Sequence, residues 1–295
     1  ISPIHEIFDA ACEEAEKRGI RVTGSEIVGL IPYDAMRNAA EHYLSKMHKS
    51  PGLPVPDLMN VAMQSLGLSD VGNFNPEDKV LGMPKTDGEL ANRITLDFVD
   101  EVSRDSPAPG GGSVAALAGA LGAALGTMVA NLSTSKAGFE EHKDELAEIS
   151  VKGQFIKDHL IKAIDDDTSA FDEVIKAMRM PKDSEKERKE RDVKMQEGYK
   201  AATLVPLRTV EFCMDGLGLC KSISQIMDES MASDVGSGAL MANAGAKAAA
   251  YNVMINLKSI TDEDFCNETN KKLESMTEYC DKLAEEVAQN VEKTL

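Results

Sequence analysis

The sequence predicts a mainly α-helical protein, in which a long antiparallel helical bundle follows a small partial α/β segment. Three observations support this prediction. The 295 residues include 4% aromatic residues, no Trp and 15 Met, so the core is built from small and flexible aliphatic side chains. From Leu90 to the C-terminus, apolar residues recur with helical period and without strand-like alternation. The uncharged run Val114–Leu132 is mostly Ala, Gly and Leu, which suits a helix in close contact with its neighbours.

The first 49 residues carry the α/β signal. Ile4–Arg18 has helical spacing, and Gly19 follows as a stop signal. Ile20–Ile31 predicts one or two short strands, and Pro32–Leu44 predicts another helix. Two short strands cannot make a stable sheet, so residues 1–49 are interpreted as the end of an α/β domain whose earlier part is missing. The start at Ile1 rather than Met suits this interpretation.

Residues 50–88 predict a linker, because Pro- and Gly-rich segments flank one short helix there. Residues 89–295 then form the helical domain, with helices expected over 90–103, 113–132, 139–180, 184–220, 234–257 and 262–291. Pro206 is expected to kink or split the fourth of these helices.

Charge and cysteine content restrict the possible partners. The net charge of −18 argues against nucleic acid and anionic membranes. The uncharged run is long enough to span a membrane, but its Ala/Gly composition and the lack of a second span argue against this. Five cysteines without metal-knuckle spacing indicate reduced thiols in a cytoplasmic protein, and no signal or transit segment is visible.

The stretch SPAPGGGS at 106–113 is a candidate anion site. A bare glycine loop that enters a helix N-terminus presents unpaired N–H groups and the positive end of the helix dipole. A tight corner before a buried helix is the alternative, and composition alone does not choose between them. The candidate binding residues are Ser106, Pro107, Gly110, Gly111, Gly112 and Ser113.

Asp167 breaks the apolar pattern of the helix expected at 139–180. Apolar residues at alternating spacings of four and three surround this position: Leu160, Ile164, Phe171, Val174 and Met178. A carboxylate on such a face must be hydrogen-bonded, paired or held protonated. General acid–base groups share these properties, so Asp167 is the candidate catalytic residue, and a buried structural aspartate is the alternative.

Four further residues are candidate substrate contacts. Arg208, just after Pro206, could pair with Asp167. Asp234 could line the site, although an N-cap role is the better interpretation. Asn252 and Asn256 lie one turn apart, so their amides could contact the edge of a heterocycle or bridge two helices.

Several stretches resemble, in the same order, the formiminotetrahydrofolate cyclodeaminase family. These are SPAPGGGSVAALAGALGAAL at 106–125, DDDTSAF at 165–171, MPK at 180–182, SDVG at 233–236 and YNVMINL at 251–257. This resemblance covers the chain from about residue 90 onward. Residues 22–32, VTGSEIVGLIP, resemble the end of a glutamate formiminotransferase domain, which in a bifunctional family precedes the cyclodeaminase.

The resemblance implies a helical, folate-binding, dimer-forming domain. Its reaction would convert 5-formiminotetrahydrofolate to 5,10-methenyltetrahydrofolate with release of ammonia, in histidine degradation and one-carbon metabolism. The second aspartate of the family's D-x-D-x-x-A-F pattern is catalytic, which corresponds to Asp167, and Asp165 before it is a candidate substrate contact. No metal or redox cofactor is expected. Because the catalytic half of the transferase lies outside this sequence, transferase activity is not predicted.

Three alternatives stay open: a methenyltetrahydrofolate cyclohydrolase on the same scaffold, a non-catalytic folate-binding or oligomerisation module, and an acidic helical bundle without a ligand, which the clustering of unusual residues favours least. The expected partners are a folate with or without a polyglutamate tail, a second copy of the chain in a homodimer or larger oligomer, and a formiminotransferase domain.

Overall fold

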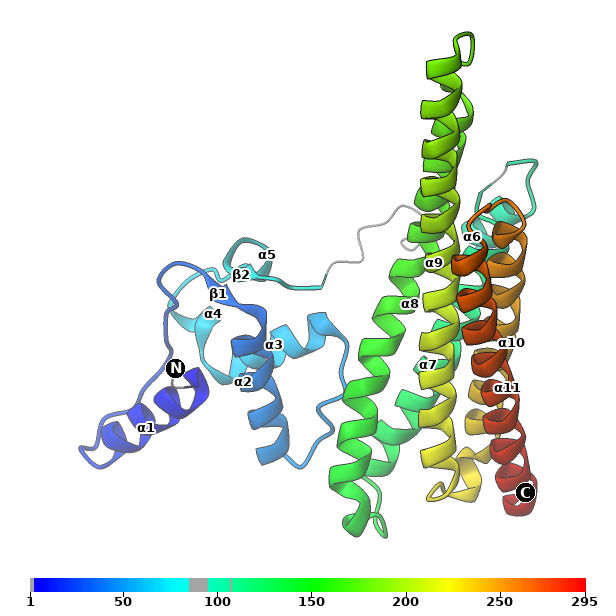
Figure 1. The fold of residues 1–295 in the computed structure, drawn as a ribbon. Coiled ribbons are helices and arrows are strands. Elements are labelled where there is room, and N and C mark those ends of the chain that lie inside the picture. Colours follow the sequence, from blue (N-terminus) through cyan, green and yellow to red (C-terminus); the bar gives the residue numbers. More distant parts are fainter. Residues whose placement is uncertain (1–2, 85–94, 107) are drawn as a thin grey trace. The chain divides into compact units, whose positions relative to one another are not determined.

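The computed structural model describes residues 3–84, 95–106 and 108–295, and the prediction of a mainly α-helical fold is confirmed (Figure 1). The chain divides into two compact units, which are described separately. Unit 1 comprises Ile1–Lys85 with Ala130–Val151, and unit 2 comprises Thr86–Val129 with Lys152–Leu295.

Unit 1 contains short helices and two very short strands. In chain order these are α1 (Ile4–Glu16), β1 (Ile31–Pro32), α2 (Tyr33–Lys46), α3 (Val55–Ser65), α4 (Leu68–Val71), α5 (Pro76–Lys79) and β2 (Val80–Leu81). The two strands pair in parallel, with Ile31 opposite Val80. The strand signal at 20–31 was therefore too long, because only its last residue finds a partner strand within the described part of the chain.

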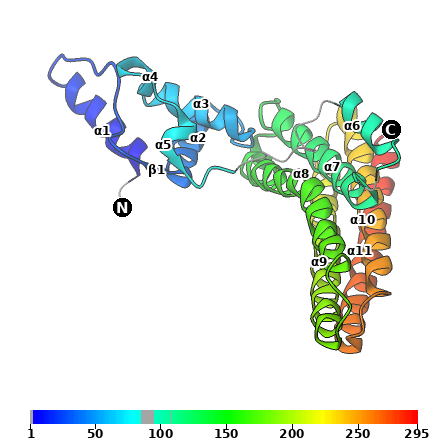
Figure 2. The same ribbon diagram turned by 90° about the horizontal axis from the view of Figure 1, so that it is seen from above.

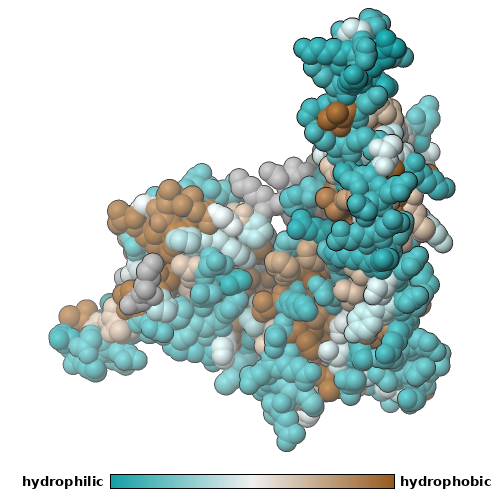
Figure 3. Space-filling view, viewed as in Figure 1, coloured by the Kyte–Doolittle hydropathy of each residue, from teal (hydrophilic) through white to brown (hydrophobic). Residues whose placement is uncertain are grey.

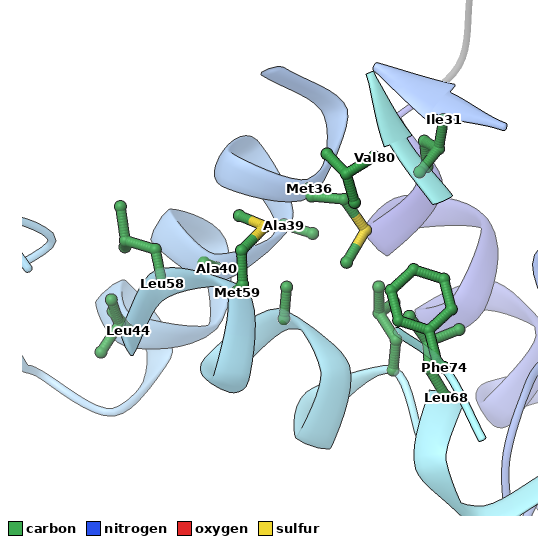
Figure 4. Close-up of a cluster of buried hydrophobic side chains, with 12 residues drawn as sticks. Ile31, Met36, Ala39, Ala40, Leu44, Leu58, Met59, Leu68, Phe74 and Val80 are labelled. Atoms are coloured by element: carbon green, nitrogen blue, oxygen red, sulfur yellow. The ribbon is translucent and has the colours of Figure 1, made fainter. Parts of the chain in front are cut away.

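The linker prediction for residues 50–88 is wrong where the structure describes them. Helix α3 packs its apolar face, with Leu58, Met59 and Ala62, against Met36 and Ala40 of α2 (Figure 4). Leu66, Leu68, Phe74 and Val80 complete the same cluster. The Pro and Gly residues of this stretch thus separate short elements that share one core, rather than marking a flexible connection.

Unit 2 is a bundle of long helices. These are α6 (Thr95–Val102), α7 (Gly111–Thr134), α8 (Lys143–Met178), α9 (Glu185–Ser224), α10 (Ala232–Leu257) and α11 (Glu263–Thr294), with α7 contributing up to Val129 and α8 from Lys152. Helices α9, α10 and α11 lie side by side (Figures 1 and 2). Helix α9 begins with a capping box between Ser184 and Glu187. The end of the α8–α9 hairpin is largely hydrophilic (Figure 3), in keeping with the alternating charges that follow Ser184.

Helix α9 continues through Pro206 as one element, so the predicted split does not occur. A proline has no N–H group, which leaves the C=O of the residue four positions earlier, Ala202, without its helical donor. The side-chain amide of Asn256 in α10 donates to this C=O through Nδ2 at 2.9 Å. The tertiary contact therefore satisfies the group that the proline leaves open.

Small residues let α7, α9 and α10 approach closely in two repeated layers. Cys213 of α9 lies against Gly119 of α7 and Gly245 of α10. Cys220 repeats this contact with Gly126, each seven residues later in its helix, and with Gly238, seven residues earlier in α10. Helix α7 is long and apolar enough to cross a membrane by length and composition, but 61% of its most apolar stretch is buried within the structure, as expected for the core helix of a bundle.

Replacing Gly122 by Ala is expected to lower the free energy of unfolding by about 1–3 kcal/mol. A Cβ at this position would lie 2.6 Å from the Gly238 C=O and 2.7 Å from the Ala242 N, so α7 and α10 must separate. The measurement is chemical denaturation monitored by circular dichroism. Gly216→Ala is the control, because its Cβ would have ordinary contacts at 3.9 Å. Equal stability of the two variants would contradict the prediction.

Candidate active site

The N-terminus of α7 binds a carboxylate of the protein itself. The first helical bond runs from the Val114 N–H to the Gly110 C=O at 3.1 Å, so the N–H groups just before Val114 have no helical acceptor. The Ser113 N–H donates instead to the Asp167 carboxylate of α8. Gly112 makes this approach possible, because a Cβ there would collide with the same carboxylate. The anion site predicted for the glycine loop is therefore occupied by Asp167.

Two opposing effects act on the pKa of Asp167. Burial against α7 raises the pKa and is the larger effect, while the Ser113 N–H beside the carboxylate lowers it, so the net shift is upward. The Ser113 hydroxyl is buried and donates to the Ile164 C=O at 2.8 Å. Since this hydroxyl has one proton, its oxygen can then accept a hydrogen bond from protonated Asp167. The site thus supports both protonation states of the carboxyl group.

Asp167 opens into a pocket of about 380 Å³ between α8, α9, α10 and the glycine loop. The backbone of Ala108, Gly110 and Gly111 forms one wall. The apolar side chains that line it further are Phe171, Met178, Ala202 and Ile255, and the polar ones are Asp167, Thr168, Tyr199, Asn252, Asn256 and Ser259. A pocket that combines apolar walls with several convergent polar groups is typical of a small-molecule site.

The amides of Asn252 and Asn256 are oriented by backbone carbonyls. The Asn252 Nδ2 donates to the Ala248 C=O, and the Asn256 Nδ2 donates to the Ala202 C=O, both at 2.9 Å. A carbonyl accepts only, so each amide must direct its nitrogen there. The two Oδ1 atoms are left as acceptors for the N–H groups of a ligand.

The structure brings most of the predicted site residues together. The ones at the pocket or in direct contact with its carboxylate are Gly110, Gly111, Gly112, Ser113, Asp167, Asn252 and Asn256. Ser106 is exposed and donates to the Ala108 C=O at 2.9 Å, so it supports the loop rather than lining the pocket. Asp165 is not among the lining residues. Pro107 lies outside the described residues.

Two predicted contacts lie elsewhere. Arg208 lines a different pocket, of about 530 Å³, which also contains Asp166 and excludes Asp167, so the predicted pairing of Arg208 with Asp167 is wrong. Asp234 lies in the first turn of α10, about 27 Å along the helix from Asn252. The N-cap of α10 is Met231, which also makes the capping prediction for Asp234 wrong.

Thr168, Phe171, Tyr199 and Ser259 are pocket residues that were not predicted as site residues. Thr168 and Phe171 lie in the DDDTSAF motif, so proximity to Asp167 was an available signal. Tyr199 and Ser259 reach the pocket only through the contact between α9 and α10, for which local sequence has no signal.

Comparison with known proteins gives consistent matches for both parts of the chain. Residues 95–275 match the family model described as formiminotransferase-cyclodeaminase, and residues 1–83 match the formiminotransferase domain. The formimidoyltransferase-cyclodeaminase of Gallus gallus is 35% identical over 94% of this chain and 52% of its own length. This chain therefore spans about half the length of that relative.

Two further relatives match the helical part. The methenyltetrahydrofolate cyclohydrolase of Methylorubrum extorquens is 35% identical over 68% of this chain and 98% of its own length. The crystal structure of formiminotetrahydrofolate cyclodeaminase from Thermotoga maritima superposes with a TM-score of 0.64 at 28% identity, covering 70% of this chain and 98% of that one.

Proposed function

The chain belongs to the formiminotransferase-cyclodeaminase family, and on this premise we propose that unit 2 catalyses the ammonia-releasing cyclisation of 5-formiminotetrahydrofolate to 5,10-methenyltetrahydrofolate. The observation that carries the proposal is the Asp167 carboxyl, which has a raised pKa and lies in the wall of a pocket lined by apolar and polar side chains. Proton transfer at nitrogen is the chemistry that this cyclisation needs, and such a carboxyl can supply it.

The proposed reaction starts from the protonated formimino group on N5. The lone pair of N10 attacks the formimino carbon and forms the N10–C bond, while the C=N electron pair moves to the amino nitrogen. Asp167 takes the proton that N10 loses and passes it to the amino nitrogen, so the C–N bond breaks and ammonia leaves. The N5 lone pair restores the double bond, which leaves the 5,10-methenyl cation. One positive charge enters and remains on the folate, and no metal or redox step is involved.

The test is to incubate the chain with 5-formiminotetrahydrofolate and to follow ammonia and the methenyl product, the latter by mass spectrometry. Stoichiometric formation of both supports the proposal. Folate binding without ammonia release would instead favour the non-catalytic binding module.

A second candidate is methenyltetrahydrofolate cyclohydrolase, because the Methylorubrum extorquens relative has that name and matches over almost its full length. The ligand would fit the same pocket, but water would attack the methenyl carbon. Hydrolysis of the methenyl compound without ammonia release from the formimino compound would favour this candidate.

We also propose that the chain forms a homodimer through α7 and α10. Helix α7 has no charged residue from Val114 onward, and Val114, Leu121 and Met128 are exposed at seven-residue intervals. Tyr251 and Ile255 of α10 are exposed as well. Exposed apolar side chains that recur along packed helices are typical of a protein interface. Since Ile255 also lines the pocket, the partner subunit would lie beside the active site.

Leu121→Glu is expected to convert the dimer into a monomer, because a buried carboxylate without a partner is costly. Light scattering coupled to gel filtration should show the mass halved. Val193→Glu is the control, because Val193 and Leu121 are similarly exposed, at 56% and 50%. Val193 lies on the hydrophilic end of the α8–α9 hairpin, so its substitution should leave the mass unchanged. Unchanged mass for Leu121→Glu would contradict this interface.

The remaining parts of the proposal follow from the reaction. The substrate would be a folate, with or without a polyglutamate tail. A formiminotransferase domain would attach the formimino group, which comes from histidine degradation. The enzyme would act in the cytoplasm, which suits the five free cysteines.

A further inference from the structure

Thr168 has a buried hydroxyl group that finds no hydrogen-bond partner among the described residues. Its side chain lines the same pocket as Asp167, which is the preceding residue in α8. An unsatisfied buried hydroxyl costs about 1–3 kcal/mol, so such a group calls for a structural or functional explanation.

Other helical threonines avoid this cost by donating to the C=O four residues earlier. Six do so, at 2.7–3.3 Å: Thr127, Thr134, Thr203, Thr209, Thr277 and Thr294. For Thr168 the corresponding acceptor is the Ile164 C=O, which already accepts the Ser113 hydroxyl at 2.8 Å. Its other lone pair accepts the Thr168 N–H in the helix. Ser113 thus occupies the acceptor that the Thr168 hydroxyl would otherwise use.

Resting on the proposed function, we infer that the Thr168 hydroxyl is a substrate contact that binds the nitrogen leaving as ammonia. This nitrogen must come close to Asp167 to receive its proton, and Thr168 follows Asp167 directly in α8 and lines the same pocket. In the protonated formimino group this nitrogen only donates hydrogen bonds, and after N10 has attacked, the lone pair of the resulting amine can accept one. A rotating hydroxyl can serve both states, whereas the oriented Oδ1 atoms of Asn252 and Asn256 can only accept.

The test compares Thr168→Val, which removes the hydroxyl at nearly constant volume, with Thr168→Ser, which retains it. Two ligands are titrated by calorimetry: 5-formyltetrahydrofolate, in which oxygen replaces the leaving nitrogen, and tetrahydrofolate, which lacks the one-carbon group. We expect Thr168→Val to bind the formyl compound roughly five- to tenfold more weakly and tetrahydrofolate unchanged, as befits one lost hydrogen bond. Thr168→Ser should bind both like the original chain.

Thermal unfolding separates this role from a structural one. Thr168→Val loses no hydrogen bond in the empty protein, so its unfolding temperature should be equal or higher. The control Thr277→Val, in α11 and outside the pocket, loses a bond to the Leu273 C=O and should unfold earlier while binding normally. The inference is overturned if Thr168→Val leaves affinity for the formyl compound unchanged, or weakens both ligands equally. The inference about Thr168 is tested by ligand binding, whereas the proposed function is tested by ammonia release from the original chain. The two can therefore fail independently.

Discussion

Asp167→Asn is expected to reduce ammonia release from 5-formiminotetrahydrofolate at least 100-fold while leaving folate binding nearly unchanged. An amide has the size of the carboxyl and can still accept from the Ser113 N–H, but it cannot take the N10 proton and pass it on. Steady-state kinetics should show the loss in kcat rather than in KM.

Asp166→Asn is the matched control for this substitution. Asp166 pairs with Lys162 at 2.6 Å and lines the other pocket, so near-normal turnover is expected. If Asp167→Asn retained more than a tenth of the original turnover, the assignment of Asp167 as the acid–base group would be wrong.

The same substitution is expected to stabilise the fold at neutral pH. Burial raises the pKa of Asp167, so the folded chain holds this proton more tightly than the unfolded chain does. As pH rises from the unfolded Asp pKa of about 3.9 through the higher folded value, the folded state loses stability. Asparagine stays neutral, so the variant escapes this loss. The variant should therefore unfold at a higher urea concentration than the original chain at pH 7.5. This difference should shrink as the pH falls from the folded pKa of Asp167 to the unfolded one.

The pH dependence of turnover follows from the same shift. Asp167 must be ionised to accept the N10 proton, so kcat/KM should fall on the acid side with an apparent pKa above the usual aspartate value. A rate that stays constant down to pH 4 would show that Asp167 is not the base.

The helices of unit 2 and the candidate catalytic residue Asp167 could both be predicted from the sequence, because the helical period of apolar residues identifies the inward face of each helix. An aspartate on that face is exceptional, whereas Asp165 and Asp166 beside it are not. Period says nothing about which neighbour covers a face. For this reason Arg208 was paired with Asp167, although the two residues line different pockets.

The linker prediction failed at residues 50–84 for a different reason. Linkers and compact runs of short helices are both rich in Pro and Gly, and composition does not separate them. The distinction lies in the apolar positions Leu58, Met59 and Ala62, which meet α2 only in the folded unit. Likewise, the unsatisfied hydroxyl of Thr168 depends on Ser113, 55 residues earlier, and becomes visible only when α7 and α8 are in contact.

Gly112→Ala is expected to lower kcat by roughly 10- to 100-fold without unfolding the protein. The new Cβ would overlap the Asp167 carboxylate, which must move away from the Ser113 N–H. A displacement of about 1 Å in a catalytic group can cost 100-fold in rate. Gly218→Ala is the control, because no atom lies within 4 Å of its Cβ, and alanine should stabilise α9 by up to about 1 kcal/mol.

Combining the two substitutions tests whether Gly112 acts through Asp167. If Gly112 serves only to admit the carboxylate, Gly112→Ala should cause little further loss of turnover in the Asp167→Asn background, and the two effects will be strongly non-additive. Independent, multiplicative losses would instead mean that the glycine loop contributes to catalysis by a separate route, such as direct contact of its backbone with the folate. The double-mutant cycle therefore distinguishes a loop that makes room for the acid–base group from a loop that binds the substrate.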